Sequence, residues 1–371
     1  MFLALKELKY SKFRFTMIAF IVVMIAWLVF LLSGLANGLQ MLGAGALKNM
    51  DVDYIVLENG ARASMRRSFL DEELLIELEA LDQVEAVTLI GNAMLRIYNI
   101  ADGGDKVDVS VLAIEPGGFL EPVVTEGTQL NLDQPLGVIV DASLQSDGFE
   151  IGSQIEVEGF DEQLIIVGFV DDQSYSYSPV VFTTLDTWRG IQFGDLINNE
   201  EMNHMVNGII LQGENINPEE LVELFPEIEV VSQHQFINGV PGYSEQSLTF
   251  NMMIIFLLVI SAFVLAIFFY VLTLQKANQF GVLKAIGASN LFLGRAVVFQ
   301  VFVLSLISII LGGLLAYGMS LAMPDAMPFA WDFEIVMTYS VAILAISMIS
   351  SLLSVRRITK IDPLQAIGRV E

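Results

Sequence analysis

Four long apolar runs without a single charged residue punctuate an otherwise mixed chain of 371 residues. A helix needs about 20 predominantly apolar residues to cross the hydrocarbon core of a bilayer, and each run is long enough. Because no charge lies inside a run, the pattern also argues against an ion-coupled carrier. The sequence therefore predicts four transmembrane helices, at Phe15–Leu47, Gln246–Gln275, Ala296–Pro324 and Ile335–Val355.

The stretch between the first two runs has a different pattern, with short apolar segments separated by glycine, proline and acidic residues. Such segments predict strands, and three other segments predict helices. Residues 48–245 are therefore expected to form an α+β domain. Its expected strands are Val52–Leu57, Ala86–Leu89, Met94–Tyr98, Val107–Ile114, Gly137–Val140, Gln154–Val157, Leu164–Val170, Val180–Thr183, Gly208–Leu211 and Ile228–Ser232. Its expected helices are Asp71–Leu81, which Ser68 would cap, Leu185–Arg189 and Pro218–Leu224.

Charge gives these elements an orientation. The chain has a net charge of −25, yet 11 of its 18 basic residues flank the apolar runs at residues 1–14, 275–295 and 356–369, while residues 48–245 hold 37 of the 43 acidic ones. Basic flanks stay in the cytoplasm. We expect a multi-pass plasma-membrane protein with both termini in the cytoplasm and an acidic extracytoplasmic domain. So acidic a surface argues against nucleic acid as a partner.

The flanks and glycines add further expectations. Residues 1–14 are typical of an amphipathic helix on the cytoplasmic membrane surface, and residues 356–371 form a cytoplasmic tail. Basic residues before an apolar run also fit a cleaved signal peptide, but this run is long and no cleavage site follows promptly, so we favour a retained helix. Gly34 and Gly38 have the spacing that lets two helices approach closely. Gly312, Gly313 and Gly318 suit close packing or a bend.

The connector at residues 275–290 is basic, lacks acidic residues and lies between two runs. Its periodicity predicts a short amphipathic helix, which Gly287 would end and after which Ser289 would cap the next helix. A cytoplasmic helix between two spans could be moved by a cytoplasmic protein. The expected apolar face is Phe280, Leu283, Ala285 and Ile286, and the expected polar face is Lys276, Gln279 and Lys284.

Signatures of catalysis are missing from the sequence. There are no cysteines and two histidines, His204 and His234, too far apart to form a local metal motif. No phosphate-binding loop, nucleophile elbow or zinc-protease motif occurs, while isolated elements such as Gly43-Ala-Gly45 are weak signals. We therefore expect a non-catalytic protein with no intrinsic metal or cofactor.

The connector Gln279-Phe-Gly-Val-Leu-Lys-Ala-Ile-Gly-Ala288 and the tail Arg356-Arg-Ile-Thr-Lys-Ile-Asp-Pro-Leu-Gln-Ala-Ile367 resemble segments of the MacB/FtsX-type permease subunits of ABC transporters. The layout of one large domain after the first span, followed by three spans, is also similar. Within that family, residues 2–14 and 275–284 resemble the haem-exporting permeases of the HrtB type.

The resemblance implies a MacB-like topology and a mechanical role. Two permease copies would pair with two cytoplasmic ABC ATPase subunits in the lipid membrane, and ATP hydrolysis in those subunits would drive export by mechanotransmission. The first-choice substrate is haem. The residues expected to couple to the ATPase are Lys276, Gln279, Phe280, Lys284, Ala285 and Gly287.

Haem iron takes Met, His, Tyr or carboxylate ligands where cysteine is absent. Candidate substrate contacts are Met24, Met41, Tyr243, Glu245, Met252 and Met253, although methionine is also a common packing residue and tyrosine is common at membrane interfaces. Two alternatives stay open at this point. The same architecture could export antimicrobial peptides, lipids or lipoproteins, or it could transmit a signal to a cell-wall hydrolase, as in FtsX.

Overall fold

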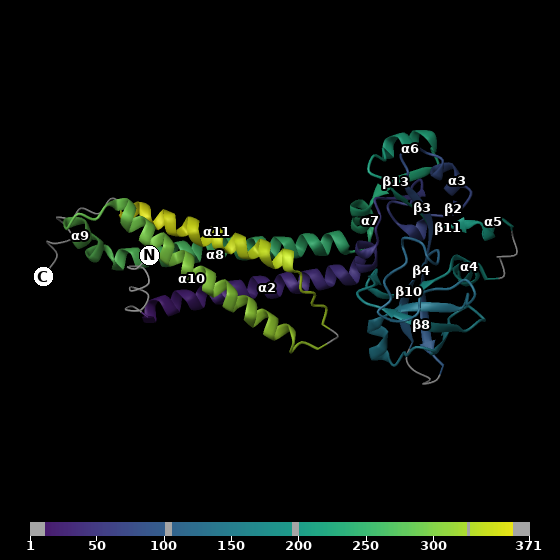
Figure 1. Ribbon diagram of the computed structural model, residues 1–371, viewed down its shortest axis with the longest axis horizontal. Helices are drawn as coiled ribbons and strands as arrows, with labels where there is room; N and C mark the ends of the chain where they lie inside the picture. Colours follow the sequence, from purple (N-terminus) through teal and green to yellow (C-terminus); the bar gives the residue numbers. More distant parts are fainter. Residues whose placement is uncertain (1–11, 101–105, 195–199, 325–326, 359–371) are drawn as a thin grey trace. The chain divides into compact units, whose positions relative to one another are not determined.

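The computed structural model describes residues 12–100, 106–194, 200–324 and 327–358, and the chain divides into two compact units (Figure 1). The helical unit comprises Met1–Gly38 and Leu248–Glu371, and the sheet domain comprises Leu39–Ser247. The amphipathic helix expected at residues 1–14 and the tail expected at 356–371 lie almost entirely outside the described residues.

Among the described residues, four helices are long and apolar enough to cross a membrane, which confirms the prediction from hydropathy. The third begins at Asn290, before the apolar run, because the Ser289 hydroxyl caps it, as predicted, and accepts a 3.2 Å hydrogen bond from the Phe292 amide. Arg295, expected before the span, therefore lies inside this helix. The four are α2 (Lys12–Asn49), α8 (Tyr243–Gln275), α10 (Asn290–Ser320) and α11 (Phe333–Ile358).

Small residues determine how closely the elements of the helical unit approach. A Cβ added to Gly312 on α10 would lie 2.7 Å from the Ala26 Cβ on α2, so these two helices touch at their backbones, as expected. A Cβ added to Gly318 would meet open space. Only part of the glycine pattern on α10 therefore serves packing within this chain.

The Gly34–Gly38 pair admits a different partner from the one expected. A Cβ on Gly34 would lie 2.3 Å from the Phe329 ring, and one on Gly38 would lie 2.4 Å from the Pro328 carbonyl oxygen. The Ala330 amide also donates a 3.1 Å hydrogen bond to the Gly34 carbonyl. The close approach is confirmed, but within this chain it accommodates the extended segment before α11 rather than a helix.

Six strands of the sheet domain pair in a closed ring, β3-β4-β10-β6-β8-β7, because β7 pairs with both β8 and β3. The β4–β10 and β6–β8 pairs are parallel and the others are antiparallel. Apolar side chains such as Ile97, Val111 and Phe169 share one buried cluster with Trp188. The strands are β3 (Ala86–Asn99), β4 (Val107–Ala113), β6 (Gly137–Asp141), β7 (Gln154–Val157), β8 (Leu164–Val170) and β10 (Ser178–Thr183).

The first half of β3 also belongs to a four-stranded antiparallel sheet of β13 (Ile228–Ser232), β1 (Tyr54–Glu58), β12 (Gly208–Gln212) and β3. Successive side chains of a strand point to opposite faces. Ile55 accordingly packs in one buried cluster, with Phe236, while Val56 packs in another, with Leu78 and Leu221 of the helices α3 (Leu74–Glu79) and α6 (Pro218–Leu224).

Two expectations about this domain were wrong. We expected two strands at 86–89 and 94–98, but β3 is continuous, since a Cβ on Gly91 would lie 2.5 Å from the Trp188 ring and the glycine makes room for that ring. The helix expected at 71–81 covers only Leu74–Glu79. Ser68 does not cap it, because the Ser68 hydroxyl accepts a hydrogen bond from the Glu58 amide.

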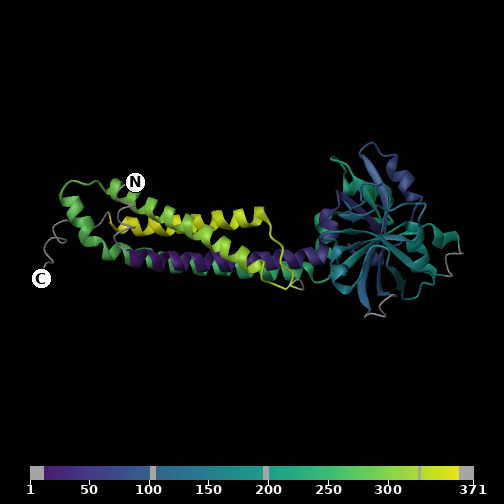
Figure 2. The ribbon, with the colours of Figure 1, turned by 60° about the horizontal axis from the view of Figure 1, so that its bottom comes forward.

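The other expected strands lie within two residues of the observed ones. Figure 2 shows the same ribbon turned, with the strands of the sheet domain and the helices of the helical unit in the same colours. The remaining elements are β2 (Leu70–Asp71), β5 (Glu126–Gly127), β9 (Ser174–Tyr175), β11 (Met205–Val206), α4 (Leu185–Phe193), α5 (Glu200–Asn203), α7 (Gln233–Gly239), α9 (Ala277–Ala285) and the 3-10 turns Met65–Arg67 and Ala142–Asp147.

Candidate functional sites: the hairpin clamp and the connector helix

The C-terminal end of α2 is interrupted at Ala44, whose backbone leaves the helical region (φ −151°, ψ 26°). Two backbone amides of the sheet domain bond carbonyls just before this kink. The Ser176 amide donates to the Gly43 carbonyl at 2.8 Å, and the Tyr177 amide donates to the Leu42 carbonyl at 3.0 Å. We call this contact, between residues 42–45 of α2 and the Ser176–Tyr177 turn, the hairpin clamp.

The turn in the clamp has an unusual backbone. Ser176 and Tyr177 join β9 to β10 with φ of 53° and 64°, the left-handed pattern of a two-residue hairpin turn that favours Asn-Gly. Non-glycine residues in this region carry local strain of about 1–3 kcal/mol each. The surrounding contacts must stabilise the turn, and its two hydrogen bonds to α2 are among them.

Two glycines of α2 leave room for close neighbours, the loop before the hairpin at Gly45 and Tyr243 of α8 at Gly43. A Cβ on Gly45 would lie 2.8 Å from the Asp172 carbonyl oxygen, and a Cβ on Gly43 would lie 3.0 Å from the Tyr243 ring. The Tyr177 hydroxyl donates a 2.6 Å hydrogen bond to Oε1 of Gln246. The Gly43-Ala-Gly45 element, a weak signal in the sequence, thus marks a close approach of two backbones.

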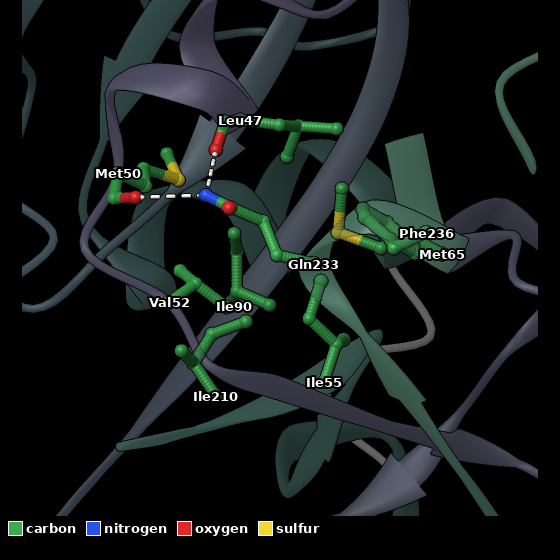
Figure 3. A pocket seen from close by; sticks show the side chains of 9 residues that line it. All are labelled: Leu47, Met50, Val52, Ile55, Met65, Ile90, Ile210, Gln233 and Phe236. Carbon is green, nitrogen blue, oxygen red and sulfur yellow. Dashed lines mark hydrogen bonds between the residues drawn. The ribbon is translucent and has the colours of Figure 1, made fainter. Parts of the chain in front are cut away.

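Gln233 of α7 holds the last turn of α2 (Figure 3). Its side-chain amide donates to the Leu47 carbonyl at 2.8 Å and to the Met50 carbonyl at 3.0 Å. The last carbonyls of a helix have no partners within the helix, so these bonds satisfy groups that would otherwise be buried alone. The surrounding side chains are apolar: Met50, Val52, Ile55, Met65, Ile90, Ile210 and Phe236.

Three of the six candidate substrate contacts lie in the sheet domain. Tyr243 is buried, and its hydroxyl donates to Oε1 of Gln40 at 3.4 Å. Met41 is half-buried, and its methyl carbon lies 3.5 Å from where a Cβ on Gly45 would stand. Glu245 is exposed in the first turn of α8. Met41 and Tyr243 are therefore both neighbours of the clamp glycines.

The other three candidates belong to the helical unit. Met252 and Met253 are each 47% exposed on α8, and Met24 is half-buried on α2. Whether any of the six contacts a substrate stays a prediction. Within the described ranges no group of three metal-ligating side chains occurs, and His204 and His234 have Glu72 and Asn238 as their respective neighbours.

The connector forms the short helix that the sequence predicts. This helix, α9, ends at Ala285, and Gly287 follows with φ of +100°, the left-handed conformation that glycine adopts without strain. The Gly287 amide donates to the Lys284 carbonyl at 3.0 Å. The predicted stop at Gly287 and the predicted cap at Ser289 are both confirmed.

The faces of the connector differ from the expected ones. Phe280, only 3% exposed, packs against Leu293 and Val297 of α10. Lys276 is buried as well, and its ammonium donates to Oε1 of Gln300 at 3.3 Å and lies 4.9 Å from the centre of the Phe15 ring. The polar-face assignment of Lys276 was wrong because the residue lies at the junction of α8 and α9, where it reaches inward to a buried amide.

The exposed surface of the connector is more apolar than expected. Gln279, Ala285 and Gly287 are exposed, while Lys284 is half-buried. Ile286, expected on the buried face, is 77% exposed because it lies beyond the last helical turn, where the helical period no longer applies. Val282, which the sequence reasoning missed, is exposed too.

The C-terminal part of the chain matches a known family. Residues 251–363 match the family described as "FtsX-like permease C-terminal". Over 371 residues the chain is 27% identical to the "Putative hemin transport system permease protein HrtB" of Staphylococcus haemolyticus, a match that covers 100% of this chain and 99% of that protein. It is 24% identical to the protein of the same name from Staphylococcus epidermidis, covering 99% of each.

Solved structures show a more distant similarity. The periplasmic region of MacB from Actinobacillus actinomycetemcomitans is 14% identical, with a TM-score of 0.37, and the match covers 53% of this chain and 96% of that one.

Proposed function

We propose that the chain is a permease subunit of the FtsX type and that it serves an ATP-driven ABC exporter that removes haem from the membrane. The similarity to HrtB carries the proposal, because it extends over the whole chain and so includes the clamp, the connector and all four helices. The positive flanks support an orientation with both termini in the cytoplasm and the sheet domain outside.

In this proposal the connector receives force from a cytoplasmic ATPase. The exposed residues Gln279, Ala285 and Ile286 form the docking surface, and the buried residues transmit the displacement. Lys276 bonds Gln300 on α10 and lies over Phe15 on α2, so a shift of α9 acts on two spans. Two permease copies and two ATPase subunits complete the transporter, and ATP is hydrolysed in the partner chains.

The clamp passes motion of α2 to the sheet domain. The turn Ser176–Tyr177 holds α2 before its kink, and Gln233 holds it after the kink. A displacement of α2 therefore moves the domain through hydrogen bonds to carbonyls on both sides of Ala44, from backbone amides before it and from the Gln233 side chain after it. The work is mechanical, and no covalent step in this chain is required.

Haem enters this mechanism as the substrate. Met41 and Tyr243 lie beside the clamp glycines, and thioether and phenolate groups are both ligands that haem iron accepts. Tyr243 would have to exchange its hydrogen bond with Gln40 for the iron. Binding at this place would couple substrate occupancy to the geometry of the clamp.

The test is a hemin titration of the permease and its ATPase reconstituted together in liposomes. We expect a saturable shift of the Soret band and ATP hydrolysis that hemin stimulates. Gly45→Leu should lose the stimulation, because its side chain would collide with the Asp172 carbonyl, and should weaken the Soret shift, because Met41 lies beside the same glycine. Gly318→Leu is the matched control, since a Cβ at Gly318 meets open space.

The outcomes separate the parts of the proposal. Hemin that only partitions into lipid, without saturation or stimulation, would refute haem as the substrate and leave the permease family intact. Normal stimulation in Gly45→Leu would refute the clamp as the route of force.

A further inference from the structure

The helices α10 and α11 enclose a groove with a volume of about 860 Å³, within the range of small-molecule sites, about 300–1,000 Å³. It lies at the N-terminal end of α10 and the C-terminal half of α11. Figure 1 shows α10 and α11 close together near the end where α9 lies. The lining is mainly apolar and includes Phe292, Phe299, Phe302, Met348 and Leu352, with Arg295 among them.

The groove has the length of one lipid leaflet. From Leu291 to Phe302 its wall follows α10 for about 16 Å, at about 1.5 Å per residue. Half of a hydrocarbon core of about 30 Å is about 15 Å. On α11, Met348, Leu352 and Val355 line the groove at helical spacing. An extended acyl chain could therefore lie along both helices.

Arg295 is the cation of this groove, and it has no hydrogen-bond or ion-pair partner within the described ranges. The described acidic residues of the helical unit are Asp332 and Glu334, both at the start of α11. Glu334 precedes Met348 by 14 residues, which is about 21 Å along the helix. The positive charge is thus far from these carboxylates, which favours an anionic ligand.

We propose that this groove binds one anionic phospholipid, with its phosphate on Arg295 and an acyl chain along the phenylalanines. Guanidinium groups bind phosphate in a bidentate manner, and basic pockets between transmembrane helices bind anionic headgroups. A small soluble anion would bind Arg295 alone and would leave the apolar wall, about 16 Å long, without a ligand. A transmembrane helix of a second copy of this chain, placed in the groove, would bring no carboxylate to Arg295 from the described apolar spans.

The groove lies next to the side chains that hold the connector helix α9 in place. Val355 lines the groove and also packs against the cluster of Phe280, Leu293 and Val297 that holds α9. A Cβ on Gly294 would lie 3.0 Å from Val355, so the two helices meet there. A bound lipid would brace this meeting point and thereby the connector. This inference requires only that the helices span a membrane and does not depend on haem as the substrate.

The test compares lipids on the purified full-length chain by native mass spectrometry, with palmitoyl-oleoyl phosphatidylglycerol against the matching phosphatidylcholine. One basic residue near a membrane surface is worth about 1 kcal/mol for an anionic lipid, which is about fivefold in affinity. We expect about fivefold tighter retention of phosphatidylglycerol. Arg295→Gln should abolish the preference, Arg295→Lys should keep most of it, and Lys284→Gln, a cation outside the groove, should leave it unchanged.

A second readout does not rely on the stability of the Arg295 variants. Phe299→Trp places a fluorophore in the groove, and phosphatidylglycerol with brominated acyl chains should quench it more strongly than brominated phosphatidylcholine does, relative to the parent chain with Trp27, Trp188 and Trp331. Equal retention or equal quenching of the two lipids would overturn the proposal. An equal loss of preference in Arg295→Gln and Lys284→Gln would also overturn it.

Discussion

The sheet domain and the helical unit bury their side chains by different rules. In the sheet domain, a buried amide bonds groups from separate segments, although the Thr183 hydroxyl and the Trp188 indole N–H have no partner among the described residues. Asn207 is fully buried, and its side chain accepts from the Asn92 amide at 2.6 Å and donates to the Ser68 carbonyl at 2.8 Å. In the helical unit, the buried hydroxyls of Ser305 and Ser308 have no partner among the described residues. They serve chiefly as small side chains between helices.

The difference follows from the two solvents. Water drives apolar side chains inward, so in the sheet domain the apolar face of a strand is the buried face. In a bilayer both faces of a helix are apolar, and small residues decide which face packs. On α8, Leu265 is fully buried and Phe263, two residues earlier, is exposed, although both are strongly apolar. Hydropathy predicts the existence of such a helix but not its contact face.

The largest expected effect tests the sheet domain. Trp188→Ala removes a fully buried ring that covers Gly91 in the middle of β3. We expect a loss of about 3–5 kcal/mol in the free energy of unfolding, the usual cost of a large-to-small change in a core. Chemical denaturation of the full chain, with hydrogen exchange of the β3 amides, measures it.

Trp331→Ala is the matched control for that experiment. Trp331 is 37% exposed and lies in the helical unit, where lipid can replace part of its contacts. If both tryptophan variants lost the same stability, the two units would not differ in the way that we describe.

The next effect tests the helical unit. Gly312→Val adds a branched side chain where a Cβ alone would already lie 2.7 Å from Ala26. We expect α2 and α10 to separate, at a cost of about 1–3 kcal/mol, as for other overpacked sites. Gly318→Val, on the same helix but facing open space, should cost far less. Thermal unfolding in nanodiscs compares the two, and equal midpoints would contradict the packing role of Gly312.

Much of the fold follows from the sequence for local reasons. Apolar segments with β-branched residues correctly predict the strands Gln154–Val157, Leu164–Val170 and Ile228–Ser232. The Gly91-Asn92 pair is typical of a turn, but it lies inside a continuous strand. A glycine is needed there because the ring of Trp188, nearly a hundred residues later in the chain, packs against it. No local pattern contains that contact.

Only part of each candidate site could be predicted from the sequence. The connector helix, its stop at Gly287 and the start of the next helix at Ser289 follow from the sequence, but the burial of Lys276 depends on Gln300 of another helix. The clamp was missed because Ser176-Tyr177 lacks the Asn-Gly signature of its turn type. Gln233 was missed because the carbonyl that it bonds, that of Leu47, lies 186 residues earlier in the sequence.

The smallest expected effect concerns a charged cluster on the sheet domain, at Glu72. Arg189 forms an ion pair with this carboxylate, and Nδ1 of His204 lies 2.6 Å from its Oε1. Burial alone would raise the pKa of Glu72, but the hydrogen bonds from His204 and Arg189 outweigh it and the pKa is lowered. The hydrogen bond to Glu72 raises the pKa of His204, and Asp71 adds to this while partial desolvation and Arg189 oppose it.

The sign of the pH dependence follows from the raised pKa of His204. The protonated ring is favoured in the folded chain, so its contribution is fully present below the unfolded pKa, about 6.5, and is lost as the pH rises through the folded pKa. Thermal unfolding of the wild type and of His204→Gln should therefore differ at acidic pH and converge at alkaline pH. The difference should be small, because His204 is exposed and solvent screens the pair. A constant difference at all pH values would show that the histidine contributes packing rather than charge, and the polar specificity that we assign to the sheet domain would then not extend to its surface.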